Sequence, residues 1–599
     1  MRGAGYKRQR TPGIQDVGPS SRRRSREAGR PVSGGTPGER PGVPRGNAFP
    51  HGTYPTGQSQ AGTAPGMVRH MVRHVIVVGA GPGGLSVAIN LAGQGFRVTV
   101  VEKDAVPGGR MKGLTMGADG EYAMDTGPSI LQLPGVLEQI FHRSGKRLAD
   151  YVTLTPVDPN TRVHFWDGTH LDTRRDVERM GQELEKFGAG KGRALKDWME
   201  DGREKYALAY EKFICTNAGS LGYYAPWRLA PTLRFKPWQT LYKQLDSFFH
   251  DDRMTYALAY PSKYLGLHPT TCSSVFSVIP FIELAFGVWH VQGGFRALAR
   301  GMMKCAQDLG VTFRMGAPVE RVKVETGRAV GVKLQGGEEL DADAVVVNAD
   351  LAYAAKNLLA PEVREGSRLT DGALERAKYS CSTFMAYYGL DRKYDLPHHL
   401  IYLSESARRT DRDALEDRTV DVDDPPFYVC NPGVSDVSAA PKGHSTLYVL
   451  VPTPNTARPV DWAKTEATLR ERIPKMLEKV GIRGVREHVK AERYFTAETW
   501  RDDFNVFRGA VFNLSHTWMQ LGPLRPRVKN AQVEGLYFVG GGTHPGSGLL
   551  TIMESANIAA DYLTREAGKG GLPGWPYVPP LEDVPEAAAK PPAPQALAG

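Results

Sequence analysis

The stretch that decides the fold runs from residue 74 to residue 110 and reads HVIVVGAGPGGLSVAINLAGQGFRVTVVEKDAVPGGR. It begins with an apolar, β-branched run at 75–78, which is typical of a buried strand. A glycine-rich turn over 79–84 follows, then a predicted helix over 85–91 and a second predicted strand over 97–101. This order of strand, turn, helix and strand predicts an α/β unit that holds a dinucleotide.

Each part of this unit has its own physical role. Gly79 permits the tight turn, Gly81 lets the backbone approach a pyrophosphate, and Gly84 lets the helix and the strand pack closely. The helix N-terminus offers unpaired N–H groups to the phosphates. Glu102 follows Gly79 by 23 residues, close to the spacing of about 20 at which a carboxylate accepts the ribose hydroxyls. An acidic residue at this place argues against a 2′-phosphate, and therefore against NADP.

The next motif, Gly108-Gly109-Arg110, indicates which nucleotide is bound. In flavoproteins with two dinucleotide-binding folds, such a segment lets the chain turn beneath the flavin diphosphate while the arginine supplies positive charge. NAD dehydrogenases have no such need, so we predict FAD as the cofactor, with Gly109 and Arg110 among its contacts. A loop with a surface arginine is the simpler alternative.

Composition narrows the possible functions. The net charge of +10 is uneven, because residues 1–66 hold eleven Lys or Arg and three Asp or Glu. The rest of the chain is nearly neutral, which argues against nucleic acid as a partner. The five cysteines have no metal-ligand spacing, so we expect buried thiols and no metal site. No apolar run is long enough to span a membrane and no signal peptide is evident, so we expect a cytoplasmic protein.

Both ends of the chain differ in composition from its body. Residues 1–66 are rich in Gly, Pro, Ser and Arg, so we predict a disordered basic extension. Met67 and Met71 open a repeated Met-Val-Arg-His just before the first strand, so a mis-assigned start remains the other interpretation. Residues 566–599 are rich in Gly, Pro and Ala and are predicted to form a disordered tail.

Between the ends, the length allows two or three domains with a large core. We predict that the FAD-binding domain comprises 71–150, 290–350 and 500–565. A substrate-binding and membrane-associating region comprises 151–289, with long polar helices, and 351–499.

Three strands are expected to form a meander, at 319–324, 330–334 and 344–347, that makes a small antiparallel sheet. The backbone at Val319 is predicted to meet the adenine.

Residues 221–243 interleave aromatic rings with Arg and Lys and lack a continuous apolar span. One interpretation is a segment that lies at a membrane interface, with Trp227 and Trp238 against lipid. The other is an aromatic-rich core segment with snorkelling bases.

These motifs together resemble the bacterial-type phytoene desaturases, a family of FAD-dependent carotenoid oxidoreductases, from about residue 73 to residue 565. The most specific parts are the C-terminal glycine loop and the block from Arg508 to Arg525. The segments that carry the resemblance are the first glycine-rich turn through Gly109-Arg110, Tyr264-Leu265-Gly266, Gly287-Val288-Trp289 through Gly294, Tyr379-Ser380-Cys381-Ser382 through Gly389-Leu390, His398-His399, Asn431-Pro432, Arg508-Gly509-Ala510-Val511-Phe512, Arg525-Pro526-Arg527 and Gly540 to Gly546.

The resemblance implies a two-dinucleotide-binding-fold flavoprotein, with a Rossmann-like FAD domain, a mixed-sheet substrate domain and a helical, membrane-facing region. It implies that phytoene is desaturated to lycopene or a related carotenoid by hydride transfer to the flavin, with quinone or oxygen as the electron acceptor. Such a substrate has no ionisable group, so binding must come from apolar burial. A peripheral enzyme that draws its substrate from the membrane surface follows.

The C-terminal glycine loop supplies the remaining predicted site residues. The resemblance implies that it closes the flavin site, with FAD contacts at Gly540, Gly541, Thr543, Pro545 and Gly546. The polar groups expected nearest the flavin, and therefore the catalytic candidates, are His544 and Arg508. A structural hydrogen bond for His544 and an ion pair for Arg508 are the alternatives.

Other functions on the same frame stay open. Another carotenoid oxidoreductase (a 3,4-desaturase, an isomerase or a ketolase) would share these motifs. An amine-oxidase-like enzyme with a covalent flavin is disfavoured because no cysteine follows Cys430. A non-catalytic lipid escort protein need not keep Glu102 and the Gly109-Arg110 pair, and both are present.

Overall fold

The computed structural model describes residues 73–216, 230–405 and 420–581. The chain divides into two units, Met1–Val68 and Arg69–Gly599, and every described residue belongs to the second. The predicted extension 1–66 and the two methionines Met67 and Met71 therefore lie outside the described residues.

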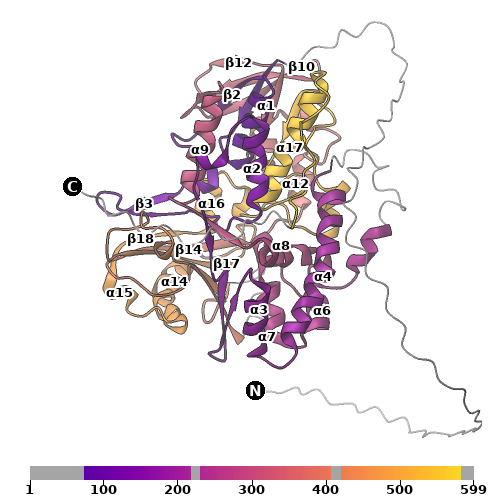
Figure 1. The fold of residues 1–599 in the computed structure, drawn as a ribbon. Coiled ribbons are helices and arrows are strands. Elements are labelled where there is room, and N and C mark those ends of the chain that lie inside the picture. Colours follow the sequence, from indigo (N-terminus) through magenta and orange to yellow (C-terminus); the bar gives the residue numbers. More distant parts are fainter. Residues whose placement is uncertain (1–72, 217–229, 406–419, 582–599) are drawn as a thin grey trace, which may run out of the picture. The chain divides into compact units, whose positions relative to one another are not determined.

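A five-stranded parallel sheet holds the predicted dinucleotide unit (Figure 1). Its inner strands are rich in buried valine, as expected where helices cover a parallel sheet, whereas the edge strand at 312–314 is Thr-Phe-Arg. In spatial order they are β19 (Leu536–Phe538), β13 (Ala344–Val347), β1 (His74–Val78), β2 (Arg97–Val101) and β9 (Thr312–Arg314). Helix α1 (Pro82–Gly93) packs against α9 (Phe295–Asp308) and α17 (Leu549–Glu566).

The local predictions for this unit are confirmed, with one shift of boundary. The strands contain the predicted 75–78 and 97–101. The helix begins three residues earlier than predicted, because Pro82 occupies its first position, where a missing N–H costs nothing.

The predicted meander is only partly correct. Its first two strands, β10 (Val319–Glu325) and β11 (Arg328–Leu334), pair antiparallel, but their third partner is the short β12 (Glu339–Asp341). Residues 344–347 instead form β13, a fully buried central strand of the parallel sheet. A run of Ala-Val-Val-Val is apolar on both faces, which suits a parallel strand and not an edge.

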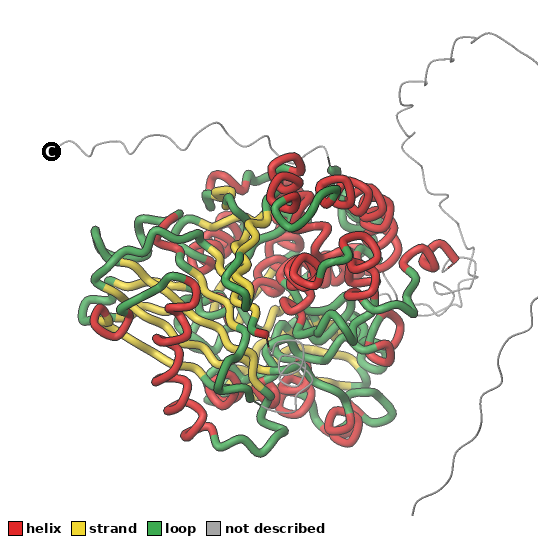
Figure 2. The backbone as a smooth tube through the Cα atoms, turned by 90° about the horizontal axis from the view of Figure 1, so that it is seen from below, coloured by secondary structure: helices red, strands yellow, loops and turns green. Residues whose placement is uncertain are grey.

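A seven-stranded mixed sheet forms the second layer of strands, and Figure 2 shows these strands gathered on one side of the helices. In spatial order they are β18 (Val489–Phe495), β14 (Ser382–Leu390), β17 (Ser445–Thr453), β16 (Phe427–Cys430), β15 (His399–Leu403), β6 (Thr161–Phe165) and β7 (His170–Thr173). Helix α14 (Trp462–Leu477) packs on one face of this sheet with Leu469 and Ile473. A further short strand, β5 (Leu154–Val157), pairs with β8 (Val288–Val291).

Residues 151–289 therefore differ from the prediction of long polar helices, because they open with three strands. Strand β6 alternates buried and half-buried positions, and such a short alternation is easily missed beside charged residues. The helices follow later, as α3 (Val177–Glu185), α4 (Lys191–Ala209), α6 (Leu241–Phe249), α7 (Asp252–Ala259) and α8 (Val278–Phe286). The remaining elements are α2 (Pro134–Arg143), α10 (Leu351–Leu358), α11 (Pro361–Arg364), α12 (Asp371–Arg376), α15 (Val485–His488), α16 (Ala497–Asp502), β3 (Leu114–Met116) and β4 (Tyr122–Met124).

The aromatic stretch 221–243 is divided in the structure. Residues 217–229, which include Trp227, lie outside the described residues. Of the described part, Phe235 is buried, whereas Leu233 is 56% and Trp238 is 70% exposed. The stretch therefore supplies both a core residue and exposed apolar side chains.

The predicted disordered tail is wrong for its first part. Residues 567–581 pack onto the helical region, where the Tyr206 hydroxyl donates to the carbonyl of Pro579 (2.9 Å) and the Trp575 indole donates to Glu554 (3.1 Å). Leu572 is only 3% exposed. The apolar and aromatic side chains between the glycines and prolines provide this burial, and composition alone conceals it. Residues 582–599 lie outside the described residues.

We expect Leu572→Ala to lower the thermal stability of the protein. Truncating a buried leucine removes its transfer free energy and leaves a cavity, at a cost of about 2–5 kcal/mol. In a chain of this size that is a fall of a few degrees in melting temperature. Val437→Ala, at a position that is 90% exposed, is the control and should leave the melting temperature unchanged. Equal behaviour of the two variants would contradict the packing of the tail.

Candidate functional site

A cavity of about 760 Å³ begins at the carboxyl ends of β1, β2 and β13 and continues to the helices around α8. The carboxyl ends of parallel strands are where α/β sheets bind ligands, and the volume is typical of cofactor and substrate sites. Eight of the predicted cofactor residues line it, namely Gly79, Gly81, Glu102, Gly109, Arg110, Val319, Gly540 and Gly541. Four predicted residues do not line it, namely Gly84, Thr543, Pro545 and Gly546.

The glycine turn leaves room for a ligand because side chains are absent from it. Gly79 has a φ of +98°, which only glycine adopts without strain. A Cβ added to Gly81 would lie 2.8 Å from Nδ2 of Asn348, and one added to Gly84 would overlap the carbonyl oxygen of Gly79. Gly84 therefore does not line the cavity itself. Its lack of a side chain lets α1 pass close to the glycine turn.

The Glu102 carboxylate is held by backbone N–H groups at the edge of the cavity. Its two oxygens accept hydrogen bonds from the N–H of Ala80 (2.6 Å) and of Asp104 (2.9 Å). Burial raises the pKa of Glu102, and these two hydrogen bonds lower it. The N–H of Ala317 donates to the Glu102 carbonyl (2.8 Å), which brings the start of β10 and Val319 beside the carboxylate.

Arg110 and Asp350 form an oppositely charged pair along the same wall. The Arg110 guanidinium donates to the carbonyl of Val511. Burial raises the pKa of Asp350 to about 6, while the N–H of Tyr353 and the charge of Arg110 act in the opposite direction. Asn513 also donates to Asp350 (2.6 Å). The pair therefore places a fixed positive charge in the cavity with its counter-charge close by.

The C-terminal glycine loop is shaped by a residue that sequence reasoning did not assign a role. Arg525 is fully buried, and its guanidinium donates to the carbonyls of Gly541 (2.6 Å) and Thr543 (3.1 Å). Burial lowers the pKa of Arg525 to about 9. The loop then enters α17, whose first residues Leu549 to Ile552 line the cavity. The position of Arg525 in the resembling block was visible in the sequence, but not its partners.

The two predicted catalytic residues are not among those that line the cavity. Arg508 forms an ion pair with Glu375 and lies over the ring of Tyr379. His544 is buried, and its ring nitrogens make no hydrogen bond of standard geometry within the described ranges. Burial, with the nearby charge of Arg525, lowers the pKa of His544 to about 4, so its imidazole is neutral at pH 7. Arg508 therefore makes an ion pair, which is the alternative to a contact with the flavin.

The far part of the cavity is apolar. Helix α8, the segment 260–265 and the start of α17 each supply side chains to it, with hydroxyl and amide groups between them. The apolar residues there are Ile214, Leu265, Val278, Ile279, Ile282, Leu549 and Leu550, and the polar ones include Ser129, Gln132, Tyr260, Lys263, Tyr264, Tyr428 and Tyr448. A long hydrocarbon would be bound here by removal of its surface from water.

A buried polar cluster lies behind Tyr428. The Tyr428 hydroxyl is 2.6 Å from Nδ1 of His399, and ligand atoms of His398, His399 and Cys430 lie within 4.8 Å of one another. These three residues could hold a metal ion, a grouping that the scattered spacing of the cysteines does not predict.

The lining fits FAD. A turn without side chains at the start of α1 exposes N–H groups to a pyrophosphate, and the Glu102 carboxylate is placed to accept ribose hydroxyls. Arg110 supplies a positive charge to the same cavity. One cavity therefore joins a dinucleotide cradle to an apolar wall.

Comparisons with known proteins agree with this reading of the site. The model of the family described as flavin containing amine oxidoreductase matches residues 82–564. An all-trans-zeta-carotene desaturase of Myxococcus xanthus is 84% identical over 512 residues, which is 85% of this chain and 97% of the relative. A zeta-carotene-forming phytoene desaturase of the same organism is 37% identical over 518 residues, 86% of this chain and 98% of the relative. An oxidoreductase structure from Methanosarcina mazei, 16% identical, shares the fold with a TM-score of 0.54 over 81% of this chain and 98% of its own.

We expect Gly84→Ala to yield protein with little bound FAD. The added methyl group would overlap the carbonyl of Gly79, and a strain of about 1.4 kcal/mol already lowers affinity tenfold. Flavin absorbance per mole of purified protein measures the effect. Gly433→Ala, whose methyl group would come no closer than 4.0 Å to a neighbour, is the matched control and should retain wild-type flavin. A fully loaded Gly84→Ala protein would refute this role.

Proposed function

Since this chain belongs to the flavin-containing amine oxidoreductase family, and within it to the bacterial carotenoid desaturases, we propose that it desaturates zeta-carotene. The enzyme is an FAD-dependent oxidoreductase. The observation that carries the proposal is the continuity of the cavity. The part lined by Glu102 and Arg110 is continuous with the part lined by apolar side chains. An unsaturated hydrocarbon held on that wall needs no charged anchor.

FAD, when bound, supplies the hydride acceptor. The residues of the chain do the rest. The glycine turn and Glu102 hold the nucleotide, and Arg110 balances charge near the phosphates. The side chains of α8 exclude water and align the polyene by apolar contact. The N-terminus of α17 directs its positive dipole end into the cavity, which favours added negative charge there.

The choice of zeta-carotene over phytoene rests on similarity. The resemblance alone predicts phytoene conversion to lycopene or a related carotenoid, and the relative named for phytoene is 37% identical. The relative named for zeta-carotene is 84% identical over nearly its whole length, which supports the later substrate. Both substrates are uncharged hydrocarbons, so the polar groups of the cavity do not distinguish them.

We expect the purified chain with FAD to consume zeta-carotene presented in liposomes at least about tenfold faster than phytoene. Products are followed by chromatography and visible absorbance, because each added double bond lengthens the conjugation. A quinone and oxygen are supplied in separate reactions, since we propose that one of them reoxidises the enzyme. Faster consumption of phytoene would contradict zeta-carotene as the preferred substrate and would identify the enzyme as a phytoene desaturase. Loss of neither substrate would overturn the proposed function.

We also propose that the enzyme binds the membrane surface. Among the helices of the described ranges, none is long and apolar enough to cross a bilayer. Leu233 and Trp238 nevertheless expose large apolar side chains close to Arg234 and Lys236. Aromatic rings beside cations are typical of segments that lie at the lipid interface.

Trp238→Glu should weaken sedimentation with anionic liposomes, because it removes an interfacial ring and adds a charge of the same sign as the lipid. Trp518→Glu is the matched control, since Trp518 is 57% exposed in a different segment. We expect several-fold weaker binding for the first variant and no change for the second. Unchanged binding of Trp238→Glu would refute the proposed contact.

A further inference from the structure

Glu283 is a buried carboxyl directly behind the apolar wall of the cavity. It lies on α8, between Ile282, which lines the cavity, and the end of the helix, and it is only 4% exposed. Its Oε2 accepts a hydrogen bond from Nε2 of Gln132 (3.0 Å). Because Gln132 also lines the cavity, one polar side chain joins the carboxyl to the substrate space.

Tyr264 provides a second connection. Tyr264 lines the cavity, and its hydroxyl is buried without a hydrogen bond of standard geometry to the described residues. Burial and then the adjacent carboxylate of Glu283 raise the pKa of Tyr264 well above its usual value. Tyr264 therefore contacts both the cavity and the Glu283 carboxyl.

Within the described ranges, no positively charged side chain compensates the carboxylate of Glu283. Burial raises its pKa to about 7, and only the interactions with Tyr264 and Gln132 lower it. Among the described residues, no lysine, arginine or histidine contributes to this pKa. A carboxyl in such surroundings changes its protonation state near neutral pH, which suits a group that exchanges protons during a reaction.

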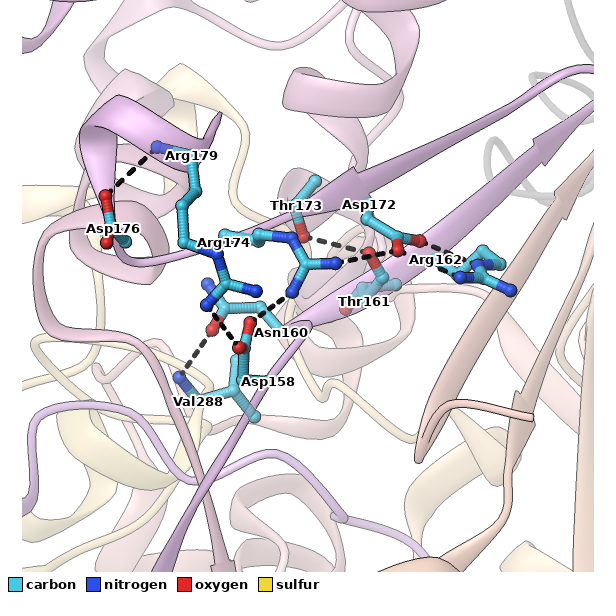
Figure 3. A network of polar contacts seen from close by, with 10 residues as sticks. All are labelled: Asp158, Asn160, Thr161, Arg162, Asp172, Thr173, Arg174, Asp176, Arg179 and Val288. Carbon is cyan, nitrogen blue, oxygen red and sulfur yellow. Dashed lines mark hydrogen bonds and ion pairs between the residues drawn. The ribbon is translucent and has the colours of Figure 1, made fainter. Parts of the chain in front are cut away.

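The backbone of Glu283 is held by Asn160, and Figure 3 shows Asn160 beside Val288 within a polar network. Asn160 donates from Nδ2 to the carbonyl of Glu283 (3.1 Å) and accepts at Oδ1 from the N–H of Val288 (3.3 Å). Nearby, Asp158 bridges Arg174 (2.6 Å) and Arg179 (2.8 Å). The end of α8 is thereby joined to the hairpin that starts the seven-stranded sheet.

Desaturation removes a hydride and a proton from adjacent carbons, and the substrate has no basic group to receive the proton. We propose that Tyr264 and Glu283 together receive it. This inference rests on the proposed function and adds to it the destination of the proton.

The atoms and electrons balance as follows. One C–H bond of the substrate breaks with its electron pair, and the hydride is taken up by FAD, so the hydrocarbon is oxidised by two electrons. The neighbouring C–H bond breaks and its electron pair becomes the new double bond. That proton passes to the Tyr264 oxygen while the Tyr264 hydroxyl proton passes to the Glu283 carboxylate. Tyr264 is unchanged at the end, and Glu283 is neutral until it releases the proton to water.

Glu283→Gln keeps the size and the hydrogen-bonding capacity of the side chain but removes the proton acceptor. We expect a rate of desaturation at pH 8 that is lower by about 100-fold or more, with normal FAD content. In the wild type the rate should rise with pH through about 7, as Glu283 loses its proton, and the variant should lack this rise. Tyr264→Phe should slow the reaction similarly while Glu283 is intact.

Glu554→Gln is the matched control. Glu554 is also fully buried with a raised pKa, but it lies on α17 away from the cavity lining and is bonded to Asn557 and Trp575. Its variant should keep the rise of rate with pH.

Thermal stability gives a readout that needs no substrate. The folded protein holds the Glu283 proton more tightly than the unfolded chain, so the wild type should lose stability relative to Glu283→Gln as the pH rises from about 4.5 to about 7. The difference should stay constant above that. Identical pH dependence of the two melting temperatures would overturn the assigned state of the carboxyl.

The outcomes separate the two hypotheses. A wild type that binds FAD but desaturates no carotenoid would overturn the proposed function. An active wild type whose Glu283→Gln variant keeps its rate within twofold, with the same pH profile, would overturn the role of Glu283 alone. Loss of the pH-dependent rise in Glu283→Gln but not in Glu554→Gln would support it.

Discussion

The close approach of three backbone segments at Gly79, Gly84 and Asn348 is the constraint on which the rest of the structure depends. A side chain at either glycine would force α1 away from the sheet. The first turn of α1 would then no longer point at the cavity, and the contacts of α1 with α9 and α17 would be lost. Close packing of this kind leaves no room for small adjustments, because protein interiors are as dense as organic crystals.

A second constraint is electrostatic. The cavity must accept a nucleotide with two phosphates at one part and a hydrocarbon at the other. The chain meets both demands by compensating most buried charges locally, as Arg110 does with Asp350 and Arg525 with loop carbonyls. Buried charges without partners cost several kcal/mol. Glu283 is an exception, because no positive charge among the described residues compensates its carboxylate. Such a perturbed carboxyl in a cavity wall is a candidate for a functional role.

The sequence predicted the features that depend on neighbours along the chain. The strands 75–78 and 97–101, the glycine turn and Glu102 follow from periodicity and spacing, and the structure has them. Prediction from the sequence failed where the structure depends on pairing between segments that are far apart in the chain. Residues 344–347 have the same composition in a meander as in a central parallel strand, and their partner β19 is almost 200 residues away. The ion-pair partner of Arg508, Glu375, also could not be found from spacing. The roles of Arg525 and Glu283 also arise only from tertiary contacts.

The order in which the parallel sheet is assembled has a consequence for biosynthesis. Its central strands come from residues 74–101 and 344–347, but β19 and the loop that completes the cavity come from residues 536–552. During translation, the last wall of the cavity is therefore made after the segments that form the rest of its lining. A chain truncated before residue 540 would carry the glycine turn intact and still lack a complete binding site.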